Sequence, residues 1–390
     1  MQKKITIVGA GKIGAAIVAL LGESGDYALT LIDQDSKALD SLSQSAGVAL
    51  SCRKVDVSDL AALTEALRDQ DAVLNACPFH LTDSIARAAK AAKAHYFDLT
   101  EDVTSTKLVT ELAATAESAM MPQCGLAPGF ISIVAHDMAR RFDEIHDVKL
   151  RVGALPLYPS NALKYNMTWS TEGLINEYCR PCEAVVDGKL REVLPLEGLE
   201  EFTLNGDRYE AFNTSGGLGT LCQTLDGKLR NLDYKTIRYP GHQAIMKLLT
   251  QDLGLAARQD LLKEVMESAL PATLQDVIVI FVTVTGRING RLMQENFARK
   301  VLGATLKGRR FSAIQMTTAA GICGVMDLVL TGALDDQLKD QSGFLRQEQV
   351  SLATFLANRF AWPYRAQPAV DAQDEAENAV GNRDSLSSAA

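Results

Sequence analysis

Three glycines and an aspartate near the start of the chain have the spacing of a dinucleotide-binding turn. Gly9, Gly11 and Gly14 follow the apolar run 5–8, and Asp33 closes a second apolar run at 29–32. The first glycine permits a tight turn, the second lets the backbone approach a pyrophosphate, and the third lets the following helix pack on its strand. The acid is placed to bind a ribose 2′-hydroxyl and to repel a 2′-phosphate. The pattern predicts a bound dinucleotide, with NAD favoured over NADP.

The nucleotide should also contact the carboxyl ends of neighbouring strands, because ligands of open parallel sheets bind at that edge. The fourth predicted strand ends at Asn75, and the backbone of Ala76 and Cys77 is expected to flank the nicotinamide ribose. The residues predicted to bind the cofactor are Gly9, Gly11, Lys12, Ile13, Gly14, Asp33, Asp56, Asn75, Ala76 and Cys77.

Two residues are candidate catalytic bases. Asp98 lies near the end of the strand-like run 95–99, the predicted fifth strand, so its carboxylate would lie at the carboxyl edge near a reacting carbon. The alternative is that Asp98 caps the next turn. His242 is the second candidate, because the pKa of a histidine lies nearest to neutral pH.

Two polar stretches suit a substrate that carries a carboxylate. Residues 211–220 combine hydroxyl groups with glycines that offer backbone amides. Residues 235–242 contain Arg238, whose guanidinium forms a planar fork that matches a carboxylate. The predicted substrate-binding residues are Arg238, Thr214, Ser215, Gly216, Tyr165 and Lys235. The alternatives are a surface position for the arginine and a packed turn for the segment around Tyr165.

The cysteines indicate free thiols and no metal site. Their number is seven, which is odd, and they are scattered along the chain. Cys179 and Cys182 form a single CxxC with no second pair and no histidine pair nearby, so a zinc site is not expected.

The order of elements predicts an α/β fold with two domains. The first 130 residues alternate apolar runs with helical patterns, which is typical of a Rossmann doubly wound parallel sheet. Beyond residue 147 the pattern changes to alternating strands with turn signals at 187–188, 205–206 and 289–290, which predicts a second α+β domain on a mixed or antiparallel sheet. A long apolar helix is expected at 313–330. We place the NAD-binding domain at 1–130, the substrate-binding and dimerisation domain at 131–330, a C-terminal extension at 331–365 and a disordered tail at 366–390.

Composition excludes several partners. The chain has 390 residues and a formal net charge of −9, which argues against nucleic acid and against an anionic membrane surface. Lys12 interrupts the first apolar stretch, and the glycine spacing explains that stretch better than a signal peptide does. We expect a cytoplasmic protein without a membrane partner.

Several separate motifs resemble the saccharopine dehydrogenase-like family. They are the glycine turn, GLAPGF at 125–130, YNMTWSTEGLINEY at 165–178, EAFNTSGGLGT at 210–220 and LDYKTIRYPGH at 232–242. The resemblance implies a Rossmann domain, a second domain that binds substrate, a homodimer or higher oligomer, and hydride transfer at a C–N bond of an amino acid. It also implies that Arg238 meets the substrate carboxylate, with Thr214, Ser215 and Gly216 nearby, and that Asp98 stands near the reacting carbon.

Three functions stay open on the sequence. Chain length resembles the lysine 6-dehydrogenase branch of the family, which implies oxidation of lysine at its ε-carbon. A saccharopine dehydrogenase would bind a secondary amine with three carboxylates and would need more cationic side chains. A non-catalytic sensor of NAD(P) is the third possibility.

Overall fold

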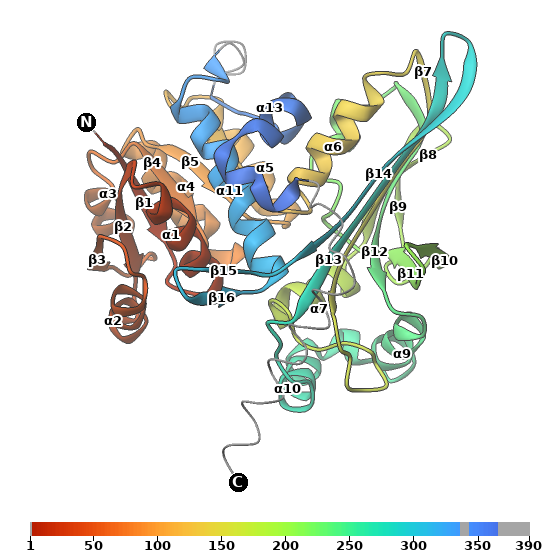
Figure 1. Cartoon of the computed structure of the whole chain (residues 1–390), viewed down its shortest axis with the longest axis horizontal. Helices are drawn as coiled ribbons and strands as arrows, with labels where there is room; N and C mark the ends of the chain where they lie inside the picture. The colour runs from red at the N-terminus through yellow and green to blue at the C-terminus, as the bar shows by residue number, and fades with distance from the viewer. Residues whose placement is uncertain (1, 336–342, 366–390) are drawn as a thin grey trace.

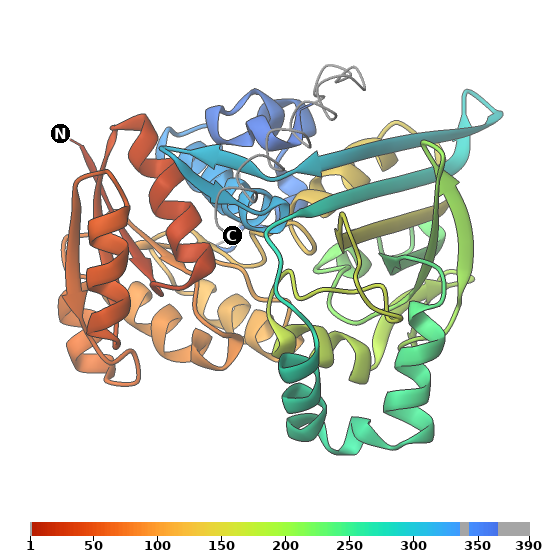
Figure 2. The same cartoon turned by 60° about the horizontal axis from the view of Figure 1, so that its bottom comes forward.

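The computed structural model describes residues 2–335 and 343–365, and within them the chain forms two large sheets that stand beside each other (Figures 1 and 2). The first sheet is parallel and has the strand order β3-β2-β1-β4-β5-β6. Its strands are β1 (Lys3–Val8), β2 (Tyr27–Asp33), β3 (Leu50–Lys54), β4 (Ala72–Asn75), β5 (His95–Asp98) and β6 (Met120–Met121). The predicted doubly wound Rossmann sheet is confirmed.

Helices connect these strands and begin at the capping residues that the local sequence supplies. The helices are α1 (Lys12–Ser24), α2 (Ser36–Ser45), α3 (Leu60–Ala66), the 3₁₀ turn η1 (Phe79–Leu81), α4 (Thr82–Ala91) and α5 (Val103–Ala113). Asp35, Asp59 and Asp102 each precede a helix and accept a hydrogen bond from an amide of its first turn. Gly25 ends α1 in the left-handed conformation, at φ 70°.

The second sheet is mixed and contains eight strands. Its main path runs β10-β11-β12-β7-β13-β14, β8 pairs with β12 and β9, and only β12 and β7 run parallel. The strands are β7 (Glu144–Pro156), β8 (Cys182–Val186), β9 (Lys189–Val193), β10 (Glu200–Leu204), β11 (Asp207–Asn213), β12 (Leu229–Arg238), β13 (Asp276–Ile288) and β14 (Arg291–Leu302). The predicted mixed sheet is therefore confirmed.

All three predicted hairpin turns form. Both central residues have positive φ in each turn: Asp187 and Gly188, Asn205 and Gly206, Asn289 and Gly290. This conformation matches the right-handed twist of the flanking strands, which explains why the dipeptides Asp-Gly and Asn-Gly occur there.

The other elements of the second half surround its sheet and connect it to the first. They are α6 (Phe130–Ala139), α7 (Thr171–Cys179), α8 (Leu221–Thr224), α9 (His242–Lys247), the π-helical turn η2 (Leu248–Asp252), η3 (Leu255–Ala257), α10 (Gln259–Ala269), the hairpin β15 (Ala304–Leu306) and β16 (Arg309–Phe311), α11 (Ala313–Leu330), η4 (Gln347–Gln349), α13 (Leu352–Ala357) and η5 (Arg359–Tyr364).

Helix α11 lies between the two sheets and contacts both α1 and β13 (Figure 1). Its first turn is fixed by a capping box between Ser312 and Gln315, and the carboxylate of Asp276 accepts hydrogen bonds from two further amides there. At the other end Asp327 accepts hydrogen bonds from Tyr27, and from Asn358 at 2.6 Å and Arg359 at 2.7 Å. These contacts join the start of β2, α11 and the C-terminal segment.

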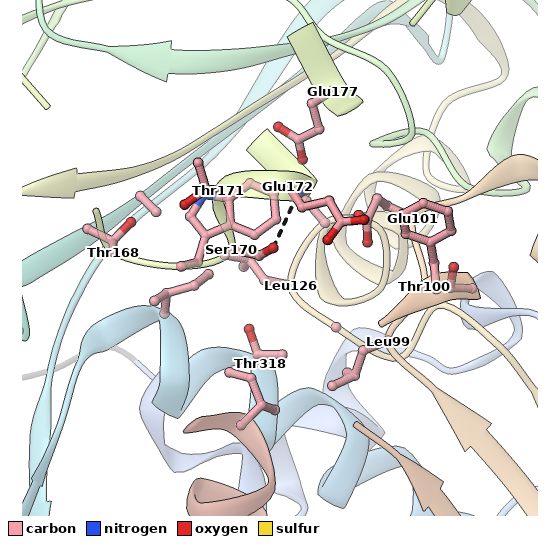
Figure 3. A pocket seen from close by; sticks show the side chains of 18 of the residues that line it. Leu99, Thr100, Glu101, Leu126, Thr168, Ser170, Thr171, Glu172, Glu177 and Thr318 are labelled. Atoms are coloured by element: carbon pink, nitrogen blue, oxygen red, sulfur yellow. Dashed lines mark hydrogen bonds between the residues drawn. The ribbon is translucent and has the colours of Figure 1, made fainter. Parts of the chain in front are cut away.

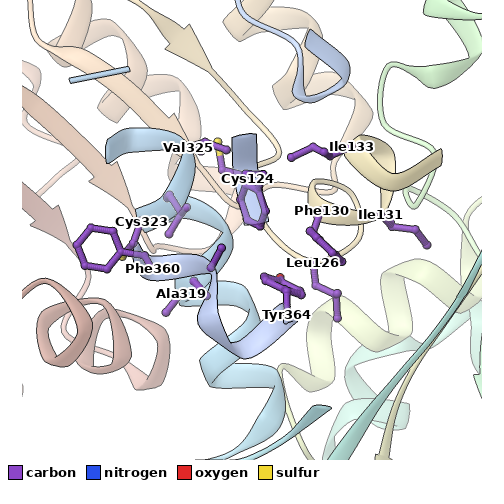
Figure 4. Packing of buried hydrophobic residues seen from close by; sticks show 14 of the residues in the cluster. Cys124, Leu126, Phe130, Ile131, Ile133, Ala319, Cys323, Val325, Phe360 and Tyr364 are labelled. Carbon is purple, nitrogen blue, oxygen red and sulfur yellow. The ribbon is translucent and has the colours of Figure 1, made fainter. Parts of the chain in front are cut away.

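One hydrophobic core runs through both halves of the molecule (Figure 4). Phe130 of α6 stacks on Tyr364 with ring centroids 3.8 Å apart, and both rings are buried. Residues 343–365 of the predicted extension thus belong to this core, whereas the predicted disordered tail lies outside the described residues. By length and composition α11 is the one described helix that could cross a membrane, but 83% of it is buried inside the molecule.

Candidate functional site

A cavity of about 570 Å³ lies where the two halves meet (Figure 3). The Rossmann half contributes the first residues of α1 and the residues after β4 and β5, and the second half contributes α7, β12 and the start of α11. The cis peptide between Ala127 and Pro128 lies in the loop 125–128, which forms another wall. The cavity is therefore lined by residues from both halves of the molecule.

The glycine turn has the geometry that a pyrophosphate needs. Gly9 has φ 109°, and an added Cβ would lie 3.0 Å from the carbonyl oxygen of Ala76. A Cβ on Gly14 would lie 1.9 Å from the carbonyl oxygen of Gly9. Gly11 begins α1 without a side-chain cap, and a Cβ there would meet nothing within 4 Å. An open helix N-terminus of this kind binds anions, so these residues fit a dinucleotide.

Asp33 anchors this turn at the end of β2. Its Oδ2 accepts a hydrogen bond from the amide of Ala10 at 2.7 Å, and its Oδ1 accepts one from the amide of Asp35 at 2.9 Å. Each carboxylate oxygen keeps a second lone pair that a ribose hydroxyl can use. Lys12 lines the cavity beside the turn.

The other predicted cofactor residues divide between the cavity and its surroundings. Ile13, Ala76 and Cys77 line the cavity. Asn75 is buried behind it, where its Oδ1 accepts a hydrogen bond from the amide of Cys77 at 3.0 Å. Asp56 lies outside and accepts hydrogen bonds from both the amide and the hydroxyl of Ser58.

Arg238, at the end of β12, faces the cavity although it is 3% exposed. Its Nε donates to the hydroxyl of Tyr178 at 2.9 Å, and its Nη1 donates to the carbonyl of Ile237 at 2.8 Å. The guanidinium carbon lies 5.1 Å from the centre of the Tyr165 ring, so the ring stabilises the cation through a cation–π contact. No hydrogen bond from Nη2 is found among the described residues, so this nitrogen is available to a ligand.

His242 lies behind Arg238 and does not line the cavity. Its Nδ1 is 3.0 Å from the carbonyl of Leu163, and its Nε2 is 3.1 Å from the Tyr178 hydroxyl. Burial, with a smaller effect of Arg238, lowers the pKa of His242 to about 3, so the ring is neutral. Because Nδ1 must then donate to Leu163, Nε2 accepts from Tyr178, and the Tyr178 hydroxyl accepts from Arg238. The geometry gives His242 a positioning role in place of the predicted proton transfer.

Asp98 also lies outside the cavity. Its carboxylate is 1% exposed and accepts hydrogen bonds from the amides of Thr100 and Gln123 and from the hydroxyl of Tyr96. Burial raises its pKa to about 6 against the lowering effect of these bonds. The carboxylate ties β5 to the segment after β6, so the structure favours the capping alternative over a catalytic base.

Lys235 points to the opposite face of β12. Side chains alternate along a strand, so Tyr234, Thr236 and Arg238 line the cavity while Lys235 faces away. Its ammonium group pairs with Glu200 at 2.9 Å on that far face. A direct contact between Lys235 and a ligand of this cavity is therefore not supported.

The Thr214–Gly216 stretch lies behind the cavity wall. The hydroxyl of Thr214 is 2.8 Å from that of Thr236, and the amide of Ser215 donates to the backbone carbonyl of Glu177. Gly216 has φ 86°, and an added Cβ would lie 2.9 Å from the carbonyl oxygen of Glu101. These residues position Glu101 and Glu177, and Thr214 and Gly216 line a smaller cavity of about 250 Å³ on the other side.

Comparison with known proteins covers nearly the whole described chain. Residues 5–123 match the model of the saccharopine dehydrogenase NADP binding domain, and residues 125–360 match that of the saccharopine dehydrogenase C-terminal domain. The chain belongs to the saccharopine dehydrogenase family.

The similar proteins in this family are distant in sequence. The chain is 26% identical over 211 residues to saccharopine dehydrogenase [NADP(+), L-glutamate-forming] of Saccharomyces cerevisiae. The aligned region covers 50% of this chain and 44% of the yeast protein. The protein of the same name from Pyricularia oryzae is 24% identical over 278 residues, 67% of this chain and 60% of that one. The chain thus aligns with less than two thirds of the length of either relative. An apo structure of the yeast enzyme has the same fold, with a TM-score of 0.72, 16% identity and coverage of 90% and 95%.

Two cavity carboxylates of this saccharopine dehydrogenase family member were missed by sequence reasoning. Glu101 follows β5, Glu177 lies on α7, and both face the cavity (Figure 3). Burial raises the pKa of Glu101 to about 7 and that of Glu177 to about 8, and each carboxylate is further affected by neighbouring acids. The available signal was that Glu177 stands inside the family-like motif at 165–178 and that Glu101 lies three residues after Asp98, at the same strand end.

Trp169 completes the wall on the α7 side. A Cβ on Gly173 would lie 2.5 Å from the Trp169 ring, so the first turn of α7 needs glycine where the indole lies against it. No group of three or more potential metal ligands occurs within residues 2–335 and 343–365.

Proposed function

We propose that this protein is an oxidoreductase that oxidises the ε-carbon of lysine, with a pyridine nucleotide as hydride acceptor. The cavity supports this because it combines a buried guanidinium with one buried and one partly buried carboxylate. Arg238 suits the single carboxylate of lysine, and Glu101 and Glu177 suit its two ammonium groups. Family membership makes the chain an oxidoreductase of the saccharopine dehydrogenase type.

The charges around the cavity favour lysine over saccharopine. Three cations line it, Lys12, Arg238 and Lys263, against four acids, Glu101, Glu172, Glu177 and Glu267. Lys12 stands at the glycine turn, and the ammonium of Lys263 lies 3.7 Å from Glu172. A substrate with three carboxylates would find Arg238 as its one buried cation among these lining residues. Saccharopine dehydrogenase activity is the second candidate, because the similar proteins carry that name.

The proposed reaction follows from the placement of these groups. Arg238 holds the α-carboxylate, and the extended side chain of lysine brings its ε-carbon toward the carboxyl edge of the Rossmann sheet. A pyridine nucleotide held at the glycine turn would supply the acceptor for the hydride of that carbon. The amine must first lose a proton, because an ammonium has no lone pair to drive hydride departure. The resulting imine adds water and releases ammonia, leaving an aldehyde. Fixed orientation of the substrate in a closed cavity supplies part of the rate.

We propose NAD as the preferred nucleotide on the basis of Asp33. Its carboxylate is fixed by the amides of Ala10 and Asp35, so it cannot turn away from a 2′-phosphate without losing both bonds. Asp33→Ser should weaken NAD binding and narrow the difference between the dissociation constants of NAD and NADP. The family domain is described as NADP binding, and tighter binding of NADP to the wild-type protein would overturn this preference.

The function is tested by a screen for reduced nucleotide. The purified chain is supplied with NAD or NADP and with lysine, saccharopine, ornithine or cadaverine, with and without 2-oxo acids. Lysine-dependent reduction without a 2-oxo acid, with ammonia as product, supports the proposal. Turnover of saccharopine alone, with glutamate as product, supports the second candidate. Tight nucleotide binding without turnover of any amine would support a sensor in place of an enzyme.

A further inference from the structure

Glu101 and Glu177 are cavity carboxylates to which no other described residue donates a hydrogen bond. Glu177 is 8% exposed, and Glu101 is partly buried. None of their carboxylate oxygens is among the fully enclosed side-chain atoms of the described residues that lack a hydrogen bond. Because both side chains line the cavity, these oxygens are exposed to it. A buried carboxylate without a partner is costly, and an ammonium ion is the ligand that would satisfy it.

The two carboxylates come from different walls of the cavity, Glu101 from the segment after β5 and Glu177 from α7. Glu177 lines the cavity together with Arg238, and its pKa is raised by burial and by the charge of Glu101 and lowered by that of Arg238. Glu101 follows β5, next to the loop 125–128 and to the carboxyl edge where Ala76 and Cys77 line the cavity. Among the charges that affect Glu101 are Asp102, Asp98 and Glu172, and Arg238 is not one of them.

Several groups hold Glu101 in this place. Asp102 caps α5 directly after it, which fixes the backbone at the end of β5. Gly216 packs against the Glu101 backbone from the second domain so closely that a Cβ would not fit. The first turn of α7 also lies close to the Glu101 side chain, since an added Cβ on Gly173 would lie 3.4 Å from Glu101 Oε1. Glu101 therefore stands where both halves of the molecule meet.

We propose that Arg238 and Glu177 together bind the α-carboxylate and α-ammonium of the amino acid, and that Glu101 accepts the proton from its reacting ammonium group. This inference rests on the proposed function, and it assigns the substrate class as an α-amino acid with a second, terminal amine. Glu101 is then a catalytic residue and Glu177 a substrate-binding residue.

The proton transfer balances with the groups already named. The N–H bond of the terminal ammonium breaks, and an O–H bond forms on Glu101. The freed nitrogen lone pair forms the C=N bond when the adjacent carbon loses its hydride, for which a bound oxidised nucleotide would be the acceptor. Glu101 returns its proton to water after the product leaves. Burial keeps the pKa of Glu101 near neutral at about 7, which suits a base that must both accept and release a proton.

Kinetics of single variants separate the two roles. Glu101→Gln should lower kcat for lysine by about 100-fold or more while KM changes little, because a general base contributes about that factor. Its residual rate should lose the acid limb near neutral pH and follow the amine's own ionisation near a pKa of about 10.4. Glu177→Gln should raise KM by about 10-fold or more and keep most of kcat. Glu264→Gln, at an exposed position of α10, is the matched control and should leave both constants unchanged.

A substrate analogue isolates Glu177. 6-Aminohexanoate keeps the carboxylate and the terminal amine of lysine but lacks the α-amino group. Glu177→Gln should therefore leave its KM unchanged while raising that of lysine. Equal effects on both compounds would overturn the assignment of Glu177, and a Glu101→Gln variant with normal kcat and an unchanged acid limb would overturn that of Glu101.

Binding experiments keep this test distinct from that of the function. Calorimetry with lysine and with 6-aminohexanoate, in the presence of reduced nucleotide, measures the same preference without turnover. If the wild-type protein oxidises no amine, the proposed function and the proton transfer by Glu101 both fail. The ratio of the dissociation constants of lysine and 6-aminohexanoate in wild type and Glu177→Gln still tests whether Glu177 binds the α-ammonium. If lysine is oxidised and the variants behave as wild type, the function stands and the inference falls.

Discussion

Arg238 donates through Nε to the hydroxyl of Tyr178 at 2.9 Å, and that hydroxyl is fixed in turn by His242. Because the neutral histidine must donate to the carbonyl of Leu163, the donor and the acceptor are fixed in each hydrogen bond of this series. The guanidinium is thereby aimed into the cavity before any ligand arrives, so less freedom is lost on binding.

Removal of this support should weaken substrate binding. Tyr178→Phe deletes the hydrogen bond to a charged group, worth about 1.5 kcal/mol or more, so KM for the amino acid should rise about 10-fold. Tyr239→Phe deletes a tyrosine hydroxyl that donates to the carbonyl of Pro156 and serves as control.

Arg238→Lys should raise KM by about 10- to 100-fold without changing the nucleotide dissociation constant. A loss of nucleotide affinity alone would place the substrate elsewhere.

Asp98→Ala should be a stability variant. It leaves the amides of Thr100 and Gln123 without an acceptor in a buried position, which costs about 2–5 kcal/mol. The urea midpoint should fall strongly, while kcat of the folded fraction should fall less than about 10-fold, since a general base contributes more. Unchanged stability together with lost turnover would instead return Asp98 to a catalytic role.

Gly216→Ala can be compared with a glycine of the same backbone conformation. Gly216 has φ 86° and Gly206 has φ 87°, but an added Cβ meets Glu101 only at Gly216, whereas nothing lies within 4 Å at Gly206. Both variants should lose about 1–2 kcal/mol from the left-handed conformation. Only Gly216→Ala should lose further stability and lower kcat, because Glu101 must move. Equal stabilities and rates would show that the contact has no effect.

The pH dependence of stability should depend on Glu177. Burial raises its pKa to about 8 in the folded chain, above the unfolded value of 4.5. The folded state then binds more protons than the unfolded state between these values, so the free energy of unfolding falls as pH rises through that window. At pH 8, Glu177→Gln should raise it by about 1–3 kcal/mol, with one pKa unit equal to about 1.4 kcal/mol. At pH 4 the variant and the wild type should be similar. Urea titrations at both pH values measure the difference.

Local sequence predicted the framework because local forces build it. The Asn-Gly dipeptide at 289–290 adopts positive φ at both residues and pairs β13 with β14 as expected. Gly9 and Gly14 are dictated by contacts inside one strand–turn–helix unit, so their spacing alone revealed them.

The site required contacts that no local pattern contains. Asp98 ends a strand as predicted, but the amide of Gln123 from a distant segment closes its hydrogen bonds. Their closeness in sequence predicts one ligand for Lys235 and Arg238, but strand alternation places them on opposite faces of β12. Glu177 looked like an ordinary helical glutamate, and only the packing of α7 against Arg238 gives it a buried position.

The uninterrupted apolar interior from α1 through α11 to Tyr364 restricts how this molecule can open. Swinging one half away from the other would expose the stacked rings of Phe130 and Tyr364 and break the bonds around Asp327. We therefore expect ligands to enter by displacement of short segments at the cavity mouth, and the two halves to melt together as one cooperative unit.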